Sequence, residues 1–185
     1  MMKILYLDTN IIIAFLKKDD VFNTISTKLM NAKILERVGS AITILELSSI
    51  ISKQFEEIEF DVKQIPDWDS LSLPAKKLLI ISYFLDKLPI KFYFNSVDEG
   101  FPIGNLLYKV HIDFSKAIRI SPFFPLKALD NLQIASALNL RDIKNIPIDY
   151  FITTDKSILD QAKVIQAQTN LTAIHPEKLS EIEYL

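Results

Sequence analysis

The sequence of 185 residues contains no cysteine, only two histidines and only three glycines. The lack of cysteine excludes disulfides. It also excludes the common Cys/His zinc sites, because His111 and His175 lie far apart with no second ligand of that kind nearby. Any metal must therefore be bound through oxygen. The scarcity of glycine leaves no flexible Gly/Ser linker, and the chain shows no repeat and no block of like charge.

Long apolar runs are also missing, since none approaches the roughly 18 residues that span a membrane. The apolar N-terminal stretch contains Asp8 and Asn10 and is followed by no small-residue cleavage site, so it is a poor signal peptide. We expect a cytoplasmic protein with no membrane partner, and the absence of cysteine fits a reducing compartment. The formal net charge of -2 provides no general attraction to nucleic acid, which would need a local basic patch or bound cations.

The residues that are present predict one domain over 1–185, in which strands and helices alternate. A hydrophobic fraction of 49% is enough for one substantial core. We expect strands at 3–7, 39–42, 149–155 and 171–176, and helices at 10–18, 24–38, 43–58, 125–140 and 156–167. This alternation predicts a three-layer α/β fold with a central, mainly parallel sheet flanked by helices.

The middle of the chain, about 55–124, is rich in Phe and Tyr and less regular. We expect a helix at 74–88, a strand at 90–96 and a helix at 103–120. The segment is therefore predicted to be a mostly helical insertion. Packing of an added layer accounts for its aromatic residues more simply than a surface that stacks on a substrate, and we assign it no function.

Four carboxylates stand out by their context. Asp8 and Asp155 each follow a predicted strand, Glu46 lies early in a helix, and Asp130 lies in another. Ligands of open α/β sheets bind outside the carboxyl ends of the strands, so the two strand-end aspartates are expected in one crevice. Clustered carboxylates repel one another unless a cation compensates them. Oxygen-only ligation favours Mg²⁺ or Mn²⁺, which suits phosphodiester cleavage.

Each acid taken alone also has a structural interpretation. Thr43 and Glu46 have the spacing of a capping box, in which Glu46 binds only a backbone amide at the start of the helix. Asp8 and Asp155 suit helix N-caps or turns, and Asp130 suits a solvated helix start. Thr9, Asn10, Thr153 and Thr154 fit turns as well as they fit a site.

The four segments YLDTNIIIAFL, AITILEL, ALDNLQIASAL and YFITTDKSI follow in this order and together resemble the PIN-domain ribonucleases, especially the VapC-like toxins of toxin–antitoxin systems. The resemblance covers about residues 3–54 and 125–175. It implies a PIN-like fold and an acidic pocket that binds Mg²⁺ or Mn²⁺ and cleaves RNA with metal-activated water. The residues of this pocket would be the acids Asp8, Glu46, Asp130 and Asp155, with Thr9, Asn10 and Thr153 in support.

Within this resemblance, Asp8 and Asp130 are the foremost direct metal ligands. Asp155 would bind directly or through water, and Glu46 would bind a second ion or orient the nucleophile. Lys156 is expected to guide the phosphate backbone. A toxin would have a protein antitoxin that docks across the cleft, and the family commonly forms homodimers. The step from Glu46 to Asp130 is longer than in compact toxins of this kind, which places the insertion within 55–124 and weakens the toxin role more than the fold.

Two other functions remain open. A haloacid-dehalogenase-like phosphatase also begins with an aspartate at a strand end, but it needs a second acid two positions later, where this chain has Asn10. A catalytically silent PIN-like adaptor that binds RNA or protein is the stronger alternative, because a fold does not imply an activity. Retention of all four acids favours the nuclease.

Overall fold

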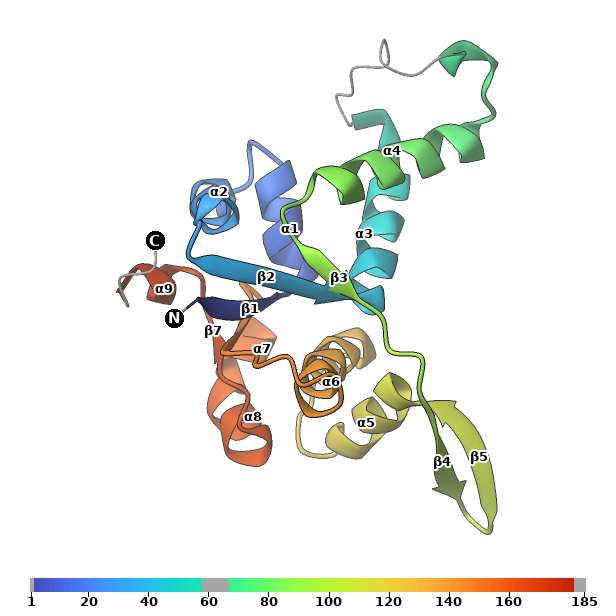
Figure 1. Ribbon diagram of the computed structural model, residues 1–185, viewed down its shortest axis with the longest axis vertical. Helices are drawn as coiled ribbons and strands as arrows, with labels where there is room; N and C mark the ends of the chain where they lie inside the picture. The colour runs from blue at the N-terminus through green and yellow to red at the C-terminus, as the bar shows by residue number, and fades with distance from the viewer. Residues whose placement is uncertain (1, 58–66, 182–185) are drawn as a thin grey trace.

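The computed structural model describes residues 2–57 and 67–181 (Figure 1). Residue 58, the expected last residue of the helix that we predicted over 43–58, lies outside these ranges. The central sheet has five parallel strands in the order β3-β2-β1-β6-β7. Their bounds are β1 Lys3–Leu7, β2 Leu35–Ser40, β3 Lys91–Tyr93, β6 Tyr150–Ile152 and β7 Ala173–Ile174. The first strand is thus the central one.

Helices cover both faces of this sheet, as the sequence predicts for a three-layer α/β fold (Figure 1). Side chains alternate along β1, so Tyr6 faces one layer while Leu5 and Leu7 face the other. One layer contains α1 Thr9–Leu16, α2 Asn23–Asn31, α3 Ala41–Lys53, α4 Leu73–Lys87 and α9 Glu177–Glu181. The other contains α5 Ile112–Ile120, α6 Ala128–Asp142, α7 Lys156–Asp160 and α8 Ala162–Thr169. Both faces of β1 are buried, which explains its nearly continuous apolar sequence.

The chain between α1 and α3 differs from our expectation. A single helix over 24–38 and a strand over 39–42 were predicted, but α2 ends at Asn31 and residues 35–40 form β2. Leu35 and Val38 are buried in this strand, which pairs in parallel with β1. Arg37 donates from Nη1 to the carbonyls of Leu29 and Ala32 at 3.0 and 2.8 Å. The sheet therefore overrides the helical spacing, and a strand side chain satisfies carbonyls at the end of α2.

In the middle segment, α4 confirms the predicted helix at 74–88 with a shift of one residue, and β3 confirms the strand predicted at 90–96 with shorter bounds. The helix predicted at 103–120 was wrong over its first half, where β4 Asp98–Ile103 and β5 Leu106–His111 form an antiparallel hairpin. Gly104 has a positive φ of 60° in the two-residue turn, a conformation that glycine adopts without strain. Among the residues that the structure describes, two short 3-10 turns precede α4, at Phe55–Glu57 and Trp68–Ser70.

Near the C-terminus, the helix predicted over 156–167 is divided into α7 and α8 at Gln161. The helix predicted over 125–140 corresponds to α6, and the strands predicted at 149–155 and 171–176 correspond to β6 and β7. Across the described ranges 2–57 and 67–181, the chain forms no helix of the length and apolarity that a membrane span requires.

Candidate acidic site

Asp8 lies where β1 ends and α1 begins, at the carboxyl end of the central strand. Its side chain is only 8% exposed and makes no capping hydrogen bond to α1. Thr153, directly after β6, donates from Oγ1 to Asp8 Oδ2 at 2.6 Å. The same hydroxyl oxygen accepts from Asn10 Nδ2 at 3.2 Å and from the backbone N–H of Asp155 at 2.9 Å. The structure thus brings Asp8, Asn10, Thr153 and Asp155 together across two neighbouring strand ends.

The environment of Asp8 opposes its ionisation. Burial raises the pKa of Asp8 to about 7, and the negative charges of Glu46 and Asp130 act in the same direction. The hydrogen bond from Thr153 and the backbone amide of Thr9 lower the pKa in part. Three of the four predicted carboxylates therefore act on one another, although they come from distant parts of the sequence.

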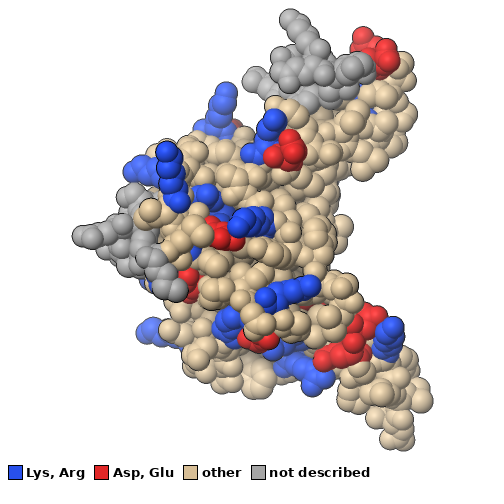
Figure 2. Space-filling model, in the orientation of Figure 1, with Lys and Arg blue, Asp and Glu red and all other residues tan. Residues whose placement is uncertain are grey.

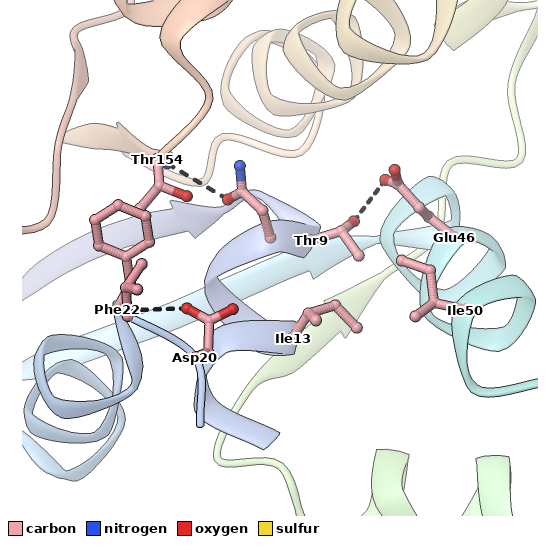
Figure 3. Close-up of a pocket in the computed structure, with 9 residues that line it drawn as sticks. Thr9, Ile13, Asp20, Phe22, Glu46, Ile50 and Thr154 are labelled. Carbon is pink, nitrogen blue, oxygen red and sulfur yellow. Dashed lines mark hydrogen bonds between the residues drawn. The ribbon is translucent and has the colours of Figure 1, made fainter. Parts of the chain in front are cut away.

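Glu46 does not cap a helix, contrary to the capping-box alternative. The capping box of α3 is one turn earlier, between Ser40 and Thr43. The Glu46 side chain turns toward α1 instead, where its Oε2 accepts from Thr9 Oγ1 at 2.7 Å (Figure 3). Gln133 Nε2 of α6 donates to the same oxygen at 3.1 Å. This carboxylate is consequently held by two donors from two other helices.

Gln133 and Tyr6 were not predicted as residues of the site. Tyr6 donates from its hydroxyl to Gln133 Oε1 at 2.6 Å, and Thr43 donates to the same oxygen at 3.2 Å. These bonds orient the amide so that Gln133 Nε2 donates to Thr9 Oγ1 at 2.9 Å and to Glu46. Burial raises the pKa of the Tyr6 hydroxyl, which keeps it a donor. One signal existed: Gln133 is three positions after Asp130, on the same side of the helix.

Asp130 lies in the first turn of α6. Burial raises its pKa, the charges of Asp155 and Glu46 raise it further, and Lys127 opposes them through its charge and its backbone. Its Oδ2 is buried and has no hydrogen-bond partner in the described part of the protein. An unpaired buried charge is costly. A hydrogen-bond donor or a cation at this oxygen would therefore stabilise the ionised form of Asp130.

Asp155 and Lys156 lie at the start of α7. Asp155 accepts from the backbone N–H of Ser157 at 2.7 Å through Oδ1, so the N-cap interpretation holds for this residue. Its charge nevertheless reaches Asp130 and raises that pKa. Lys156, the first residue of the helix, is exposed to solvent beside this edge of the site.

A divalent cation such as Mg²⁺ requires several oxygen ligands close together. Within 2–57 and 67–181, no three acidic, histidine or cysteine side chains stand close enough to form a complete metal-binding group. Three of the four acids accept hydrogen bonds from protein donors: Asp8 from Thr153, Glu46 from Thr9 and Asp155 from Ser157. The free Asp130 oxygen and the raised pKa of Asp8 fit a missing positive charge, and Mg²⁺ and Mn²⁺ prefer oxygen ligands.

Comparisons with known proteins find a family match and a similar solved structure. The model of the PIN domain family matches residues 5–164. None of the curated protein sequences compared with the chain matches it. A similar solved structure is the crystal structure of VapBC2 from Rickettsia felis bound to a DNA fragment from their promoter. It has a TM-score of 0.49 and 15% sequence identity, and the alignment covers 93% of this chain and 98% of that chain.

Proposed function

We propose, because this chain belongs to the PIN domain family, that it is a metal-dependent endoribonuclease that cleaves RNA phosphodiester bonds at Asp8, Glu46, Asp130 and Asp155. The observation that carries the proposal is the mutual influence of these acids. Glu46 and Asp130 raise the pKa of Asp8, and Asp155 raises that of Asp130. Such carboxylates at the carboxyl end of a parallel sheet suit a divalent cation and a phosphate substrate.

Asp8 and Asp130 would hold Mg²⁺ or Mn²⁺ directly, since each has an environment that favours compensation by positive charge. Asp155 would contribute the oxygen that Ser157 does not occupy, or act through water. A divalent cation bound there lowers the pKa of an attacking water and stabilises charge on the phosphate.

The protein groups around the acids orient them. Thr153 fixes one oxygen of Asp8, and Asn10 in turn binds Thr153. Thr9 and Gln133 both donate hydrogen bonds to Oε2 of Glu46. Its Oε1 would accept the proton of a water molecule or bind a second ion. Thr9, Asn10, Thr153 and Gln133 are thus proposed as positioning residues.

The finer biological roles are part of the same proposal and rest on the resemblance to VapC-like toxins. We propose that the protein acts in the cytoplasm on an RNA whose phosphate backbone is guided by Lys156. A protein antitoxin would cover the acidic site, and the protein would form a homodimer. The hairpin and α4 lie within the segment 55–124, which we propose is an insertion into a single domain over 1–185.

A silent adaptor is the second candidate. It is favoured by the hydrogen bonds that already engage Glu46 and Asp155, and by the absence of a complete metal-binding group within the described ranges. Such a protein would bind RNA or a protein partner without cleaving it.

The deciding experiment incubates purified protein with mixed structured and single-stranded RNAs in Mg²⁺, Mn²⁺ or EDTA. We expect cleavage only with metal, and a loss of roughly 100-fold or more in Asp8→Asn and Asp130→Asn. Asp160→Asn, which changes an exposed carboxylate at the end of α7, serves as the matched control and should retain activity. Circular dichroism establishes that each variant is folded. Metal-dependent cleavage that persists in Asp8→Asn would contradict the site, and RNA binding without cleavage by the wild type would select the adaptor.

A further inference from the structure

A cavity of about 300 Å³ opens beside the acidic site, between α1, α3 and the chain that connects α1 to α2. Its lining includes both polar and apolar side chains (Figure 3). Glu46 and Thr154 provide polar groups, whereas Ile13, Phe22 and Ile50 provide apolar surface. Because Glu46 belongs both to this cavity and to the acidic site, a group bound in the cavity would lie next to the proposed position of cleavage.

Asp20 is the second carboxylate of the cavity and comes from the connection between α1 and α2. Its Oδ1 accepts from the backbone N–H of Phe22 at 2.8 Å, which holds the side chain in place (Figure 3). No protein donor in the described part of the chain binds its other oxygen. An ionised carboxylate only accepts hydrogen bonds, so a ligand that satisfies Asp20 must present N–H or O–H groups.

The combination of apolar walls and a carboxylate acceptor matches a flat ring that has donors on one edge. The volume is at the lower end of the roughly 300–1,000 Å³ of small-molecule sites, so it suits one ring system rather than a stack of several. Guanine presents two adjacent donors, N1–H and the 2-amino group, to a single carboxylate. Adenine and cytosine present one amino donor beside an acceptor, and uracil presents one N–H between two carbonyl acceptors.

We propose that this cavity is a subsite that accepts a guanine of the RNA strand next to the cleaved phosphate, with Asp20 as the specificity-determining residue. This inference rests on the proposed nuclease function and extends it to the substrate. The apolar side chains Ile13, Phe22 and Ile50 would pack against the ring, as apolar and aromatic surfaces do in other single-strand binders. An arginine side chain of a protein partner carries a similar pair of donors. The nucleobase is favoured because any strand cut beside Glu46 must bring a neighbouring nucleoside within reach.

The test is an NMR titration of the full chain with GMP, AMP, CMP and UMP in EDTA, which measures binding without cleavage. We expect GMP to bind about 10-fold more tightly than UMP, a ratio in the range of a bidentate base contact. Asp20→Ala should reduce that ratio to about one. Asp19→Ala removes the same charge from the exposed neighbouring position and should leave the ratio unchanged. Sequencing of cleavage ends from a random RNA pool in Mn²⁺ should show guanine at one fixed flanking position in the wild type but not in Asp20→Ala.

Equal affinity for the four nucleotides, or a guanine preference that survives in Asp20→Ala, would overturn the subsite. Binding of arginine amide to the cavity residues with no binding of GMP would also overturn it, and would assign the cavity to a protein partner. The two proposals fail separately. Cleavage that needs Asp8 and shows no guanine preference refutes only the subsite, whereas Asp20-dependent binding of GMP without any cleavage refutes only the nuclease.

Discussion

Asp8 combines deep burial with a proposed role in binding a metal ion. It directly follows three strand residues that are fully buried, and its carboxylate is itself almost completely enclosed. Thr153 and the backbone of Thr9 favour its ionised form, but burial and two neighbouring acids outweigh them. Between about pH 4 and pH 7, Asp8 in the metal-free protein therefore keeps a proton that an ordinary aspartate would release.

The stability of the metal-free protein should depend on pH through this residue. The pKa of Asp8 is raised from 3.8 to about 7 on folding, so its contribution to stability is fully present below pH 3.8 and is lost as the pH rises through about 7. Between pH 5 and pH 8 we expect the free energy of unfolding to fall by about 1–3 kcal/mol more in the wild type than in Asp8→Asn. Asparagine keeps an oxygen that can accept from Thr153. The measurement is urea unfolding in EDTA.

The same unfolding experiment reads out metal binding independently of activity. At pH 8, Mg²⁺ or Mn²⁺ should stabilise the wild type more than Asp8→Asn, because a ligand that binds only the folded state raises its stability. The exposed variant Asp160→Asn should be stabilised by metal as much as the wild type.

The pH dependence of unfolding also has an outcome that would contradict the raised pKa of Asp8. If the stability of the wild type changes with pH as that of Asp8→Asn does, Asp8 ionises normally in the folded protein.

Lys156 is expected to act on RNA through its charge alone. It is exposed beside the N-cap Asp155, so Lys156→Glu should leave the fold intact and weaken RNA binding. The loss should be larger at low than at high salt, because contacts to phosphate release counterions. Fluorescence anisotropy across a salt series measures this effect. Lys163→Glu makes the same change in α8, and an equal loss in both variants would mean that overall charge rather than position governs binding.

At the scale of secondary-structure elements, the site depends on a hydrogen-bond network that joins β1, α3 and α6. Tyr6, Thr43 and Gln133 are each at most 1% exposed, and Gln133 continues the network to Thr9 and Glu46. A buried polar network of this kind stabilises the fold only when its members are satisfied together. It fixes Glu46 from the core side and leaves the opposite side open to the cavity.

The hydrogen-bond network should make the effects of two substitutions on the free energy of unfolding non-additive. Tyr6→Phe removes one hydroxyl, and Gln133→Leu removes the amide at similar volume; each should cost about 1–3 kcal/mol of stability. The double variant should be less destabilised than the sum of the two, because both break the same bond. Urea unfolding of the wild type, the two single variants and the double variant gives the free energies of unfolding for this double-mutant cycle. Additive effects would show that Tyr6 and Gln133 act separately.

At the scale of the whole molecule, the hairpin β4–β5 extends away from the central sheet (Figure 1). Figure 2 shows a concave margin between the α4 arm and the hairpin arm, with no Lys, Arg, Asp or Glu at the hairpin tip. Leu106 and Leu107 at this tip are 62% and 74% exposed, and Leu78 on α4 is 67% exposed. Neighbouring exposed apolar side chains, such as those of Leu106 and Leu107, are typical of a protein interface.

The proposed homodimer should therefore depend on the hairpin. Light scattering coupled to size-exclusion chromatography is expected to give a dimer for the wild type and a monomer for Leu107→Glu. An exposed substitution of this kind usually changes stability by less than about 0.5 kcal/mol, so the fold should persist. Val164→Glu introduces the same charge on α8, where the valine is 39% exposed, and should remain dimeric. A wild type that stays monomeric at all concentrations would contradict the proposal.

Much of the architecture was readable from local patterns. The apolar stretch before Asp8 predicted the central strand, and the spacing after Leu126 predicted α6. The failures have different causes. The predicted helix over 24–38 includes residues 35–38 of β2, because the pairing of β2 with β1 is not visible in local spacing. The predicted helix over 103–120 includes β5, although Gly104 and Asn105 form a favourable two-residue turn that indicates a local hairpin.

The sequence by itself determined the alternation of strands and helices, the four acids and the oxygen-only chemistry, because these follow from residue types and short spacings. Only the tertiary structure decided that Glu46 is held by Thr9 and Gln133 instead of capping α3, and that Thr153 binds Asp8. It also decided that Asp20 lines a cavity together with Glu46. These relations join side chains that are brought together only when the sheet and its two helical layers pack, and no local rule of spacing encodes them.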